Sequence, residues 1–304
     1  MDVRPARELI RRQHGAATIE QLVTAGLSRA TIRAQVDARR WRRYGDHTVL
    51  THNHVPTRTQ LMWIAVLDPT GLVCLGGLTA LETVGFRFFG KELELVHVVL
   101  QRGAKTWPHP QIKVHESRRL LRGDIDERSP IPRTRVARSA LDAAAWQPFP
   151  RYACALLAGV VQQRLCGVRD LEEELRHVGR IRHKQHMRLV IQDIAGGSEA
   201  LSEIDLVVMC RRFGLPIPDR QARRRDATGR MRYLDAEWRL PGRSVVLEVD
   251  GAHHLRVEHW EADLKRERQV VTSGSIVLRA TANEIRLDPG GVARDLRAAG
   301  VTDG

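Results

Sequence analysis

Residues 244–250 read SVVLEVD, and this stretch decides the architecture of the C-terminal third of the chain. Its apolar residues follow one another almost without interruption, which is typical of a strand in the middle of a sheet. Glu248 and Asp250 stand two residues apart at its end, so both side chains lie on one face if the strand stays regular. Two neighbouring carboxylates repel each other until a cation arrives, and oxygen ligands of this kind suit Mg²⁺ or Mn²⁺. In the alternative interpretation, Asp250 begins a turn and Glu248 forms a salt bridge at the sheet edge.

The sequence around this strand predicts a small α/β layer unit. Its elements follow the order helix, strand, strand, strand, helix, strand, helix. The expected ranges are 203–213, 218–226, 230–240, 244–250, 257–271, 276–278 and 291–299. Asp235 adds a third carboxylate in the middle of a strand. Arg223, Arg224 and Arg225 would contact phosphates if DNA lies across this sheet, and a solvated edge that discourages strand pairing is equally compatible.

Five segments in this region resemble the motifs of the DUF559 family, which belongs to the PD-(D/E)XK nuclease superfamily and is related to the very short patch repair endonucleases. They are LSEIDLVVMCRRFGLP (201–216), YLDAEW (233–238), LEVDGAHH (247–254), EADLKRER (261–268) and SIVLRATANEIR (275–286). The resemblance spans roughly residues 196–300. It implies a restriction-endonuclease-like α/β domain that hydrolyses phosphodiester bonds with bound Mg²⁺ or Mn²⁺.

The resemblance also implies a metal site. Asp235 and Glu248 are the expected ligands, together with Asp250 and the carbonyl of Val249. Glu203 is expected at the edge of the site.

Two basic groups complete the implied site. His254 is the expected group to activate water or protonate the leaving group. The wider superfamily ordinarily has Lys where this chain has Asp250, so transition-state charge must be stabilised from elsewhere. Arg266 or the neighbouring Lys265 is the expected substitute, although Arg266 could instead form only a helix ion pair with Asp263.

The N-terminal end of the chain is strongly basic. The 304 residues include 49 Lys and Arg against 36 Asp and Glu, a net charge of +13 that favours a polyanionic partner. Residues 1–60 hold eleven arginines against five acidic residues. Three short helices are expected here, over 6–13, over 19–25 with Thr18 as N-cap, and after Ser28. A β-like segment follows around the Gly45-Asp46 turn.

This order predicts a winged helix-turn-helix, in which the third helix enters the major groove of double-stranded DNA and the wing holds phosphates. The arginines expected to bind nucleic acid are Arg29, Arg33, Arg39, Arg40, Arg42 and Arg43. The alternative is a three-helix packing module whose arginines are merely solvated.

Two segments resemble AbiEi-type antitoxins of type IV toxin–antitoxin systems. IEQLVTAGLSRATIRAQVDARRWRRYGDHTVL (19–50) is similar to their N-terminal winged helix, and GGLTALETVGF (76–86) is similar to the segment that follows it. The resemblance implies a possible cognate toxin as a partner.

The whole chain is therefore expected to be an α+β multidomain protein. We expect a winged helix-turn-helix over 1–55, a mixed α/β connecting module over 56–192 and a DUF559-like domain over 193–304, with a hinge at 193–197.

No run approaches the roughly 18 apolar residues of a membrane helix, and the N-terminus lacks a signal-type stretch, so a cytoplasmic location is expected. Four well-separated cysteines fit a reducing compartment.

Two functions follow from these features. The first is a DNA-binding protein with a metal-dependent endonuclease-like C-terminal domain. The second is a non-catalytic transcriptional regulator or antitoxin-like protein that retains the nuclease fold as a scaffold. The oligomeric state is left open by the sequence.

Overall fold

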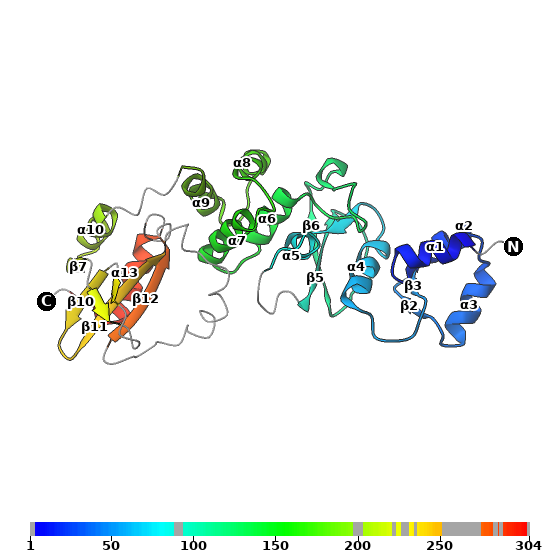
Figure 1. The fold of residues 1–304 in the computed structure, drawn as a ribbon, viewed down its shortest axis with the longest axis horizontal. Coiled ribbons are helices and arrows are strands. Elements are labelled where there is room, and N and C mark those ends of the chain that lie inside the picture. The colour runs from blue at the N-terminus through cyan, green and yellow to red at the C-terminus, as the bar shows by residue number, and fades with distance from the viewer. Residues whose placement is uncertain are drawn as a thin grey trace. The chain divides into compact units, whose positions relative to one another are not determined.

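The computed structural model describes residues 4–87, 94–196, 203–220, 223–225, 231–233, 236–250, 275–281, 285 and 288–302 (Figure 1). Helices and short sheets alternate over these ranges, which confirms the predicted α+β class. None of the helices found there is both long and apolar enough to cross a membrane.

The chain divides into two compact units. Unit 1 consists of Met1–Phe86 and Gly90–Asp142, and unit 2 consists of Arg87–Phe89 and Ala143–Gly304. The three-segment division expected from the sequence stays a prediction.

Residues 4–50 of unit 1 form three helices and a small antiparallel sheet. The elements are α1 (Arg4–Arg12), β1 (Ala16–Thr18), α2 (Ile19–Thr24), α3 (Arg29–Asp37), β2 (Arg42–Tyr44) and β3 (Thr48–Leu50). Thr18 forms a capping box with Gln21 at the start of α2, and the Ser28 hydroxyl accepts a hydrogen bond from the Thr31 N–H at the start of α3. The expected helices, their caps and the hairpin at Gly45 are confirmed, whereas β1 was not expected.

The small sheet has the strand order β1-β3-β2, and all three residues of its middle strand β3 are buried. Val49 of β3 packs with Leu22 and Ile32 of the helices. Its neighbour Leu50 lies in a second core, which includes the buried residues of α4 (Arg58–Leu67). Because adjacent strand residues point to opposite faces, one short sheet serves both cores.

The rest of unit 1 is built around a three-stranded sheet. The elements are α4, β4 (Val73–Leu75), α5 (Gly77–Glu82), β5 (Val96–Gln101), β6 (Ile112–Ser117), the 3₁₀ helix η2 (Arg122–Asp124) and α6 (Val136–Ala145), which continues into unit 2. β5 is central, antiparallel to β4 and parallel to β6. Helices and strands thus alternate in this region, in keeping with the mixed α/β composition expected there.

Unit 2 begins with a helical layer. In α7 (Pro150–Gln162), residues 153–160 are all buried, as their apolar composition predicts. α9 (Lys184–Gly196) packs against both α7 and α8 (Val168–His177). Residues 193–196, expected as part of a hinge, are the last residues of α9.

The C-terminal part of unit 2 contains a four-stranded sheet with the order β12-β11-β10-β7. The elements are α10 (Glu203–Arg212), β7 (Asp219–Arg220), β8 (Arg223–Arg225), β9 (Met231–Tyr233), β10 (Ala236–Leu240), β11 (Arg243–Asp250), β12 (Ser275–Thr281) and α13 (Pro289–Ala298). β11 lies between antiparallel β10 and parallel β12, which confirms the inner strand predicted from SVVLEVD. The helix expected over 257–271 lies outside the described residues.

Two strand predictions in this region are wrong. The ranges 218–226 and 230–240 were each expected to form one strand, but each contains two. β7 pairs with β10 in the main sheet, whereas β8 pairs only with β9 in a separate ribbon. The polar run at 219–225 offers no alternating apolar pattern that could have marked this division.

Candidate functional sites

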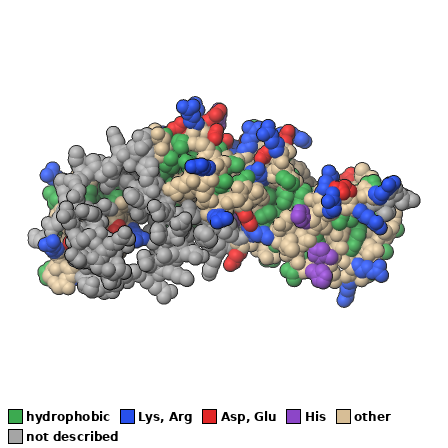
Figure 2. Space-filling model, in the orientation of Figure 1, with side chains coloured by type: hydrophobic (Ala, Val, Ile, Leu, Met, Phe, Trp, Pro, Cys, Tyr) green, Lys and Arg blue, Asp and Glu red, His purple; other side chains and the backbone are tan. Residues whose placement is uncertain are grey.

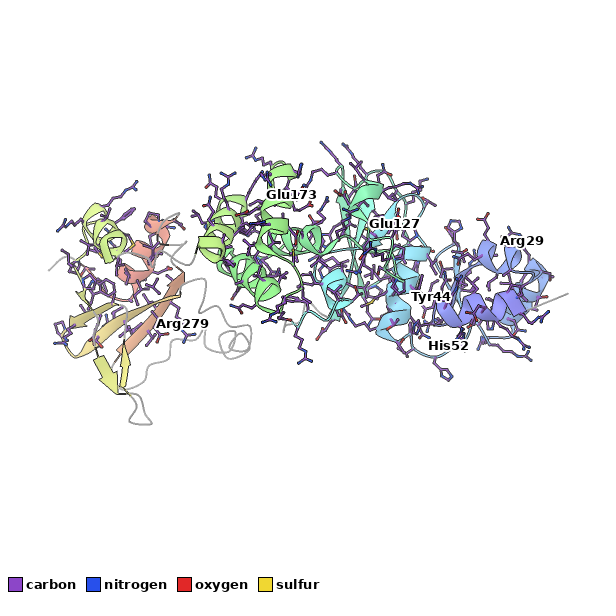
Figure 3. The ribbon with its side chains drawn as sticks, turned by 45° about the horizontal axis from the view of Figure 1, so that its top comes forward. Arg29, Tyr44, His52, Glu127, Glu173 and Arg279 are labelled. Atoms are coloured by element: carbon purple, nitrogen blue, oxygen red, sulfur yellow. The ribbon has the colours of Figure 1, made fainter. Side chains whose placement is uncertain are left out.

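The first candidate site is the basic surface of α3 and β2, which we call the arginine surface. Arg29 begins α3 and Arg33 follows one turn later, so the two side chains lie on the same face of the helix. The remaining four arginines follow the helix or lie on β2. All six expected nucleic-acid ligands are exposed: Arg29, Arg33, Arg39, Arg40, Arg42 and Arg43. Figure 2 shows Lys and Arg side chains spread over this end of the molecule, and Figure 3 labels Arg29.

Most of these guanidinium groups are only lightly engaged. Arg33 Nε lies 3.6 Å from Asp37 Oδ2, and both side chains are largely exposed, so the pair contributes little to stability. Arg43 donates hydrogen bonds to the carbonyls of Gly45 and Asp46, which fixes the hairpin turn. Arg39 has φ 53°, a left-handed conformation that glycine usually occupies after a helix. The surface therefore presents cations that remain available to a ligand.

The second candidate site is the carboxylate face of the C-terminal sheet. Strand alternation divides this sheet into two faces. One face carries Trp238, Val245 and Leu247, which pack in a core with residues of α10 and α13. The other face carries Glu237 of β10 and Glu248 of β11, because Glu237 pairs with Val246, two residues before Glu248. The sheet is thus apolar toward its helices, and its opposite side carries charged side chains of both signs, since Arg239 and Arg279 accompany the two glutamates.

Glu248 forms an ion pair with Arg279 on the neighbouring strand. The two residues are directly opposite in the parallel β11–β12 register, and Arg279 Nε donates to Glu248 Oε2 at 2.9 Å. Both side chains are partly exposed, at 36% for Glu248 and 39% for Arg279. Half of the alternative interpretation is therefore confirmed, since Glu248 is salt-bridged, but it stands on an inner strand and not at an edge.

Two residues of this face were missed from the sequence. Arg279 lies within SIVLRATANEIR, but its role could not be predicted, because the pairing of β11 with β12 spans a long stretch of sequence and leaves no local signal. Glu237 is only 2% exposed, and its Oε2 lies 3.9 Å from Arg239 Nε. Its place directly after Asp235 and Ala236 in YLDAEW was the available signal.

The other predicted site residues are only partly described. Glu203 is the first residue of α10, and Asp250 is the last residue of β11, opposite Thr281 of β12. The arginines expected to contact phosphates from this domain, Arg223, Arg224 and Arg225, form β8. Asp235, His254 and Arg266 lie outside the described residues. The structure therefore does not bring the expected catalytic set together or separate it.

Glu248 is the predicted metal ligand whose side chain the structure describes, so it decides whether a divalent metal fits here. Its carboxylate already has a cationic partner in Arg279. In the ranges that the structure describes, no three His, Cys, Asp or Glu side chains are grouped so that they could hold a metal ion. The predicted Mg²⁺ or Mn²⁺ site stays a prediction, and no chemical step is derived through it.

Unit 1 contains a pair of histidines, His97 buried and His115 half-buried, that the sequence did not indicate. His97 on β5 lies opposite Lys113 of β6, and His115 follows two residues further along β6, on the same face of the sheet. The two rings are stacked with centroids 5.2 Å apart, and Nδ1 of His97 lies 3.0 Å from Nε2 of His115. Burial, followed by the charges of His97 and Lys113, lowers the pKa of His115 to about 3. His115 is therefore neutral at pH 7 and acts as a packed polar ring.

Comparison with known proteins adds no family to this description: no family model matches the sequence, and no curated protein matches it significantly.

Proposed function

We propose that the protein binds double-stranded DNA through an N-terminal winged helix-turn-helix. In this proposal α3 enters the major groove, and the β2–β3 hairpin with its flanking arginines holds backbone phosphates. The observation that carries the proposal is the exposure of all six arginines on α3, after it and on β2. The net charge of +13 supports the same polyanionic partner.

The salt dependence of binding tests this proposal. Each phosphate neutralised by a protein cation lowers the logarithm of the affinity by about 0.9 per tenfold rise in salt. The variants Arg33→Ala and Arg40→Ala should each weaken binding to a blunt duplex and reduce this slope. Arg180→Ala is the matched control, since Arg180 is an exposed arginine of unit 2 outside the proposed interface. Fluorescence anisotropy over a salt series measures both quantities, and identical slopes for all four proteins would contradict the proposal.

We further propose that the C-terminal part of unit 2 is a metal-dependent endonuclease-like domain. The arrangement of α10, antiparallel β10 and β11, parallel β12 and α13 supports it, as does the position of Glu248 and Asp250 at the end of an inner strand. Asp235 would join these two as a metal ligand, and the ion would polarise the phosphodiester and activate water. Glu203, His254 and Arg266 would take the roles that the DUF559 resemblance implies.

The Glu248–Arg279 ion pair favours a second candidate function. A guanidinium that already neutralises the inner-strand carboxylate removes part of the need for a metal cation. This observation favours a non-catalytic regulator or an antitoxin-like protein, with a cognate toxin as a possible partner and the nuclease fold as a scaffold.

Cleavage and metal binding separate the two candidates. The protein is incubated with plasmid, single-stranded and mismatched DNA, with and without Mg²⁺ or Mn²⁺, and thermal unfolding is followed in parallel. An enzyme should cut only with metal, and metal should raise its thermal midpoint because ligands stabilise the folded state. Asp235→Asn and Glu248→Gln should abolish both effects.

Arg279→Gln provides the matched comparison, since it frees Glu248 while leaving every proposed ligand in place. Metal-dependent stabilisation that becomes larger in this variant would show competition between Arg279 and the metal. Absence of cleavage and of any metal-induced shift in both the wild type and Arg279→Gln would favour the regulator.

A further inference from the structure

An exposed tryptophan lies beside the basic hairpin in unit 1. Among the Trp, Phe and Tyr residues whose side chains the structure describes, Trp107 and Phe149 are the exposed ones, and Trp107 is 43% exposed. Trp107 lies in the segment between β5 and β6, far in sequence from the hairpin. Its ring meets Tyr44 of β2 edge-on, with ring centroids 6.4 Å apart and an interplanar angle of 77°. The fold thus joins an exposed indole to the proposed wing.

His109 completes the aromatic cluster. Its ring centroid lies 5.5 Å from that of Trp107 and 6.1 Å from that of Tyr44. Burial, followed by the charge of Arg42, lowers the pKa of His109, so the ring is neutral at pH 7. Tyr44 is only 3% exposed and lies where the N-terminal sheet adjoins α4 (Figure 3). One member of the cluster therefore packs in the core of unit 1.

Backbone hydrogen bonds hold the tryptophan segment in place. The Trp107 N–H donates to Oδ2 of Asp68 at 3.2 Å, and Asp68 is itself 7% exposed. The Thr70 N–H donates to the Lys105 carbonyl at 3.0 Å. Because the segment is fixed before any ligand arrives, a ligand that stacks on Trp107 pays little ordering entropy.

Two basic side chains accompany the aromatic cluster. The guanidinium carbon of Arg42 lies 5.5 Å from the centroid of the Tyr44 ring, in a cation–π arrangement. Lys105 is exposed two residues before Trp107. We call Arg42, Tyr44, Lys105, Trp107 and His109 the Trp107 patch. Arg42 also belongs to the arginine surface, so the two surfaces are continuous.

We propose that the Trp107 patch stacks an unpaired base, and that the preferred ligand is DNA in which a duplex adjoins a single-stranded segment. This inference rests on the proposed DNA-binding function and extends it. A blunt duplex keeps its bases stacked on one another and offers no free base face to an indole. A single strand offers both a base face and a phosphate, which match Trp107 and the basic side chains of the patch.

The test compares two labelled DNAs: a blunt duplex, and the same duplex with a short single-stranded extension. Full-length protein is titrated by fluorescence anisotropy with the variants Trp107→Ala, Trp107→Phe and Leu121→Ala. Leu121 is the control, because it is another exposed apolar residue of unit 1, 66% exposed, and lies outside the patch. Loss of one stacked base should weaken binding to the extended DNA roughly tenfold in Trp107→Ala.

Binding of Trp107→Ala to the blunt duplex should stay as in the wild type, and Trp107→Phe should keep most of the preference. Because Trp107→Phe retains an aromatic ring, it keeps the test valid even if the alanine variant loses stability. Equal preference for extended DNA in all three variants and the wild type would overturn the inference.

Failure of this inference is distinguishable from failure of the proposed function. If Arg33→Ala weakens binding to both DNAs while Trp107→Ala changes neither, the function holds and the patch assignment is wrong. If Trp107→Ala weakens binding to the extended DNA alone, while Arg33→Ala weakens binding to neither DNA, the patch is a single-strand site and α3 is not the recognition helix.

Discussion

At the scale of single residues, Arg39 combines a positive charge with a backbone conformation that favours glycine. It follows the C-cap residue Ala38 of α3 and has φ 53°, so its own Cβ is crowded by its backbone. Arginine therefore stands at a position where glycine would be less strained. The proposed binding of DNA phosphates would give a physical reason for an arginine here.

Arg39→Gly should separate binding from stability. The thermal midpoint should stay the same or rise, because glycine accepts the left-handed conformation without strain. Affinity for duplex DNA should fall several-fold, since one phosphate contact is lost. Anisotropy and thermal unfolding measured on the same preparation check both results. Undiminished affinity would mean that Arg39 faces no phosphate.

His115 should make unit 1 sensitive to acid. Its pKa in the folded protein is lowered to about 3 from an ordinary value of 6.5, so the unfolded chain takes up this proton first as the pH falls. The stabilising effect of the neutral ring is complete above about pH 6.5 and declines as the pH falls toward 3. Denaturant unfolding at pH 7 and pH 5 should show a smaller loss of stability in His115→Phe than in the wild type. The exposed His54→Phe serves as control, and an equal loss in all three proteins would refute the assignment.

At the scale of secondary-structure elements, the hairpin and α4 meet at one close contact. Gly45 forms the hairpin turn with φ 57°, and a Cβ added there would overlap the carboxylate of Asp68, which caps the C-terminal end of α4. Glycine is required twice at this position, for its backbone conformation and for the space that it leaves.

Gly45→Ala should destabilise unit 1 by more than the roughly 1 kcal/mol that a left-handed alanine ordinarily costs. Asp68→Gly removes the obstructing carboxylate. Adding Gly45→Ala to Asp68→Gly should therefore lower the free energy of unfolding by less than adding it to the wild type. Denaturant unfolding of the four proteins gives the coupling free energy between the two positions. Additive effects would mean that the two residues do not obstruct each other.

The elements also show what a sequence can and cannot predict. The helix caps Thr18 and Ser28 and the apolar run of β11 are local signals. The structure confirms the helix starts and the inner strand that they predict. β1 and β4 have three residues each, too few for a periodic pattern. The Glu248–Arg279 pair depends on which strands become neighbours, and the expected catalytic set could not be assembled because several of its members lie outside the described residues.

At the scale of the whole chain, the N-terminal elements have a small core of their own around Leu22, Ile32 and Val49, but they also share a second core with α4. Leu50 and Tyr44 pack in the core that contains Trp63 and the other buried residues of α4. A buried aliphatic side chain contributes roughly 1.5–3 kcal/mol, so removing the N-terminal elements costs the rest of unit 1 part of its core.

A fragment covering 56–146 should therefore unfold at lower temperature than a fragment covering 1–146, or aggregate through the exposed face of α4. Circular dichroism on heating and size-exclusion chromatography check this result. Equal thermal midpoints would show that the two cores are independent. Point variants of the arginine surface are consequently better tests of DNA binding than deletion of the N-terminus.

The two-sided burial of β3 has a consequence for amide hydrogen exchange. Opening the Val49 and Leu50 amides to solvent requires both flanking cores to separate, so no local fluctuation of either core alone exposes them. Their exchange is expected only through global unfolding of unit 1, at a rate that reports its full stability. Unit 1 should therefore respond to a bound ligand as one cooperative body, with protection gained at α3 accompanied by protection at β5.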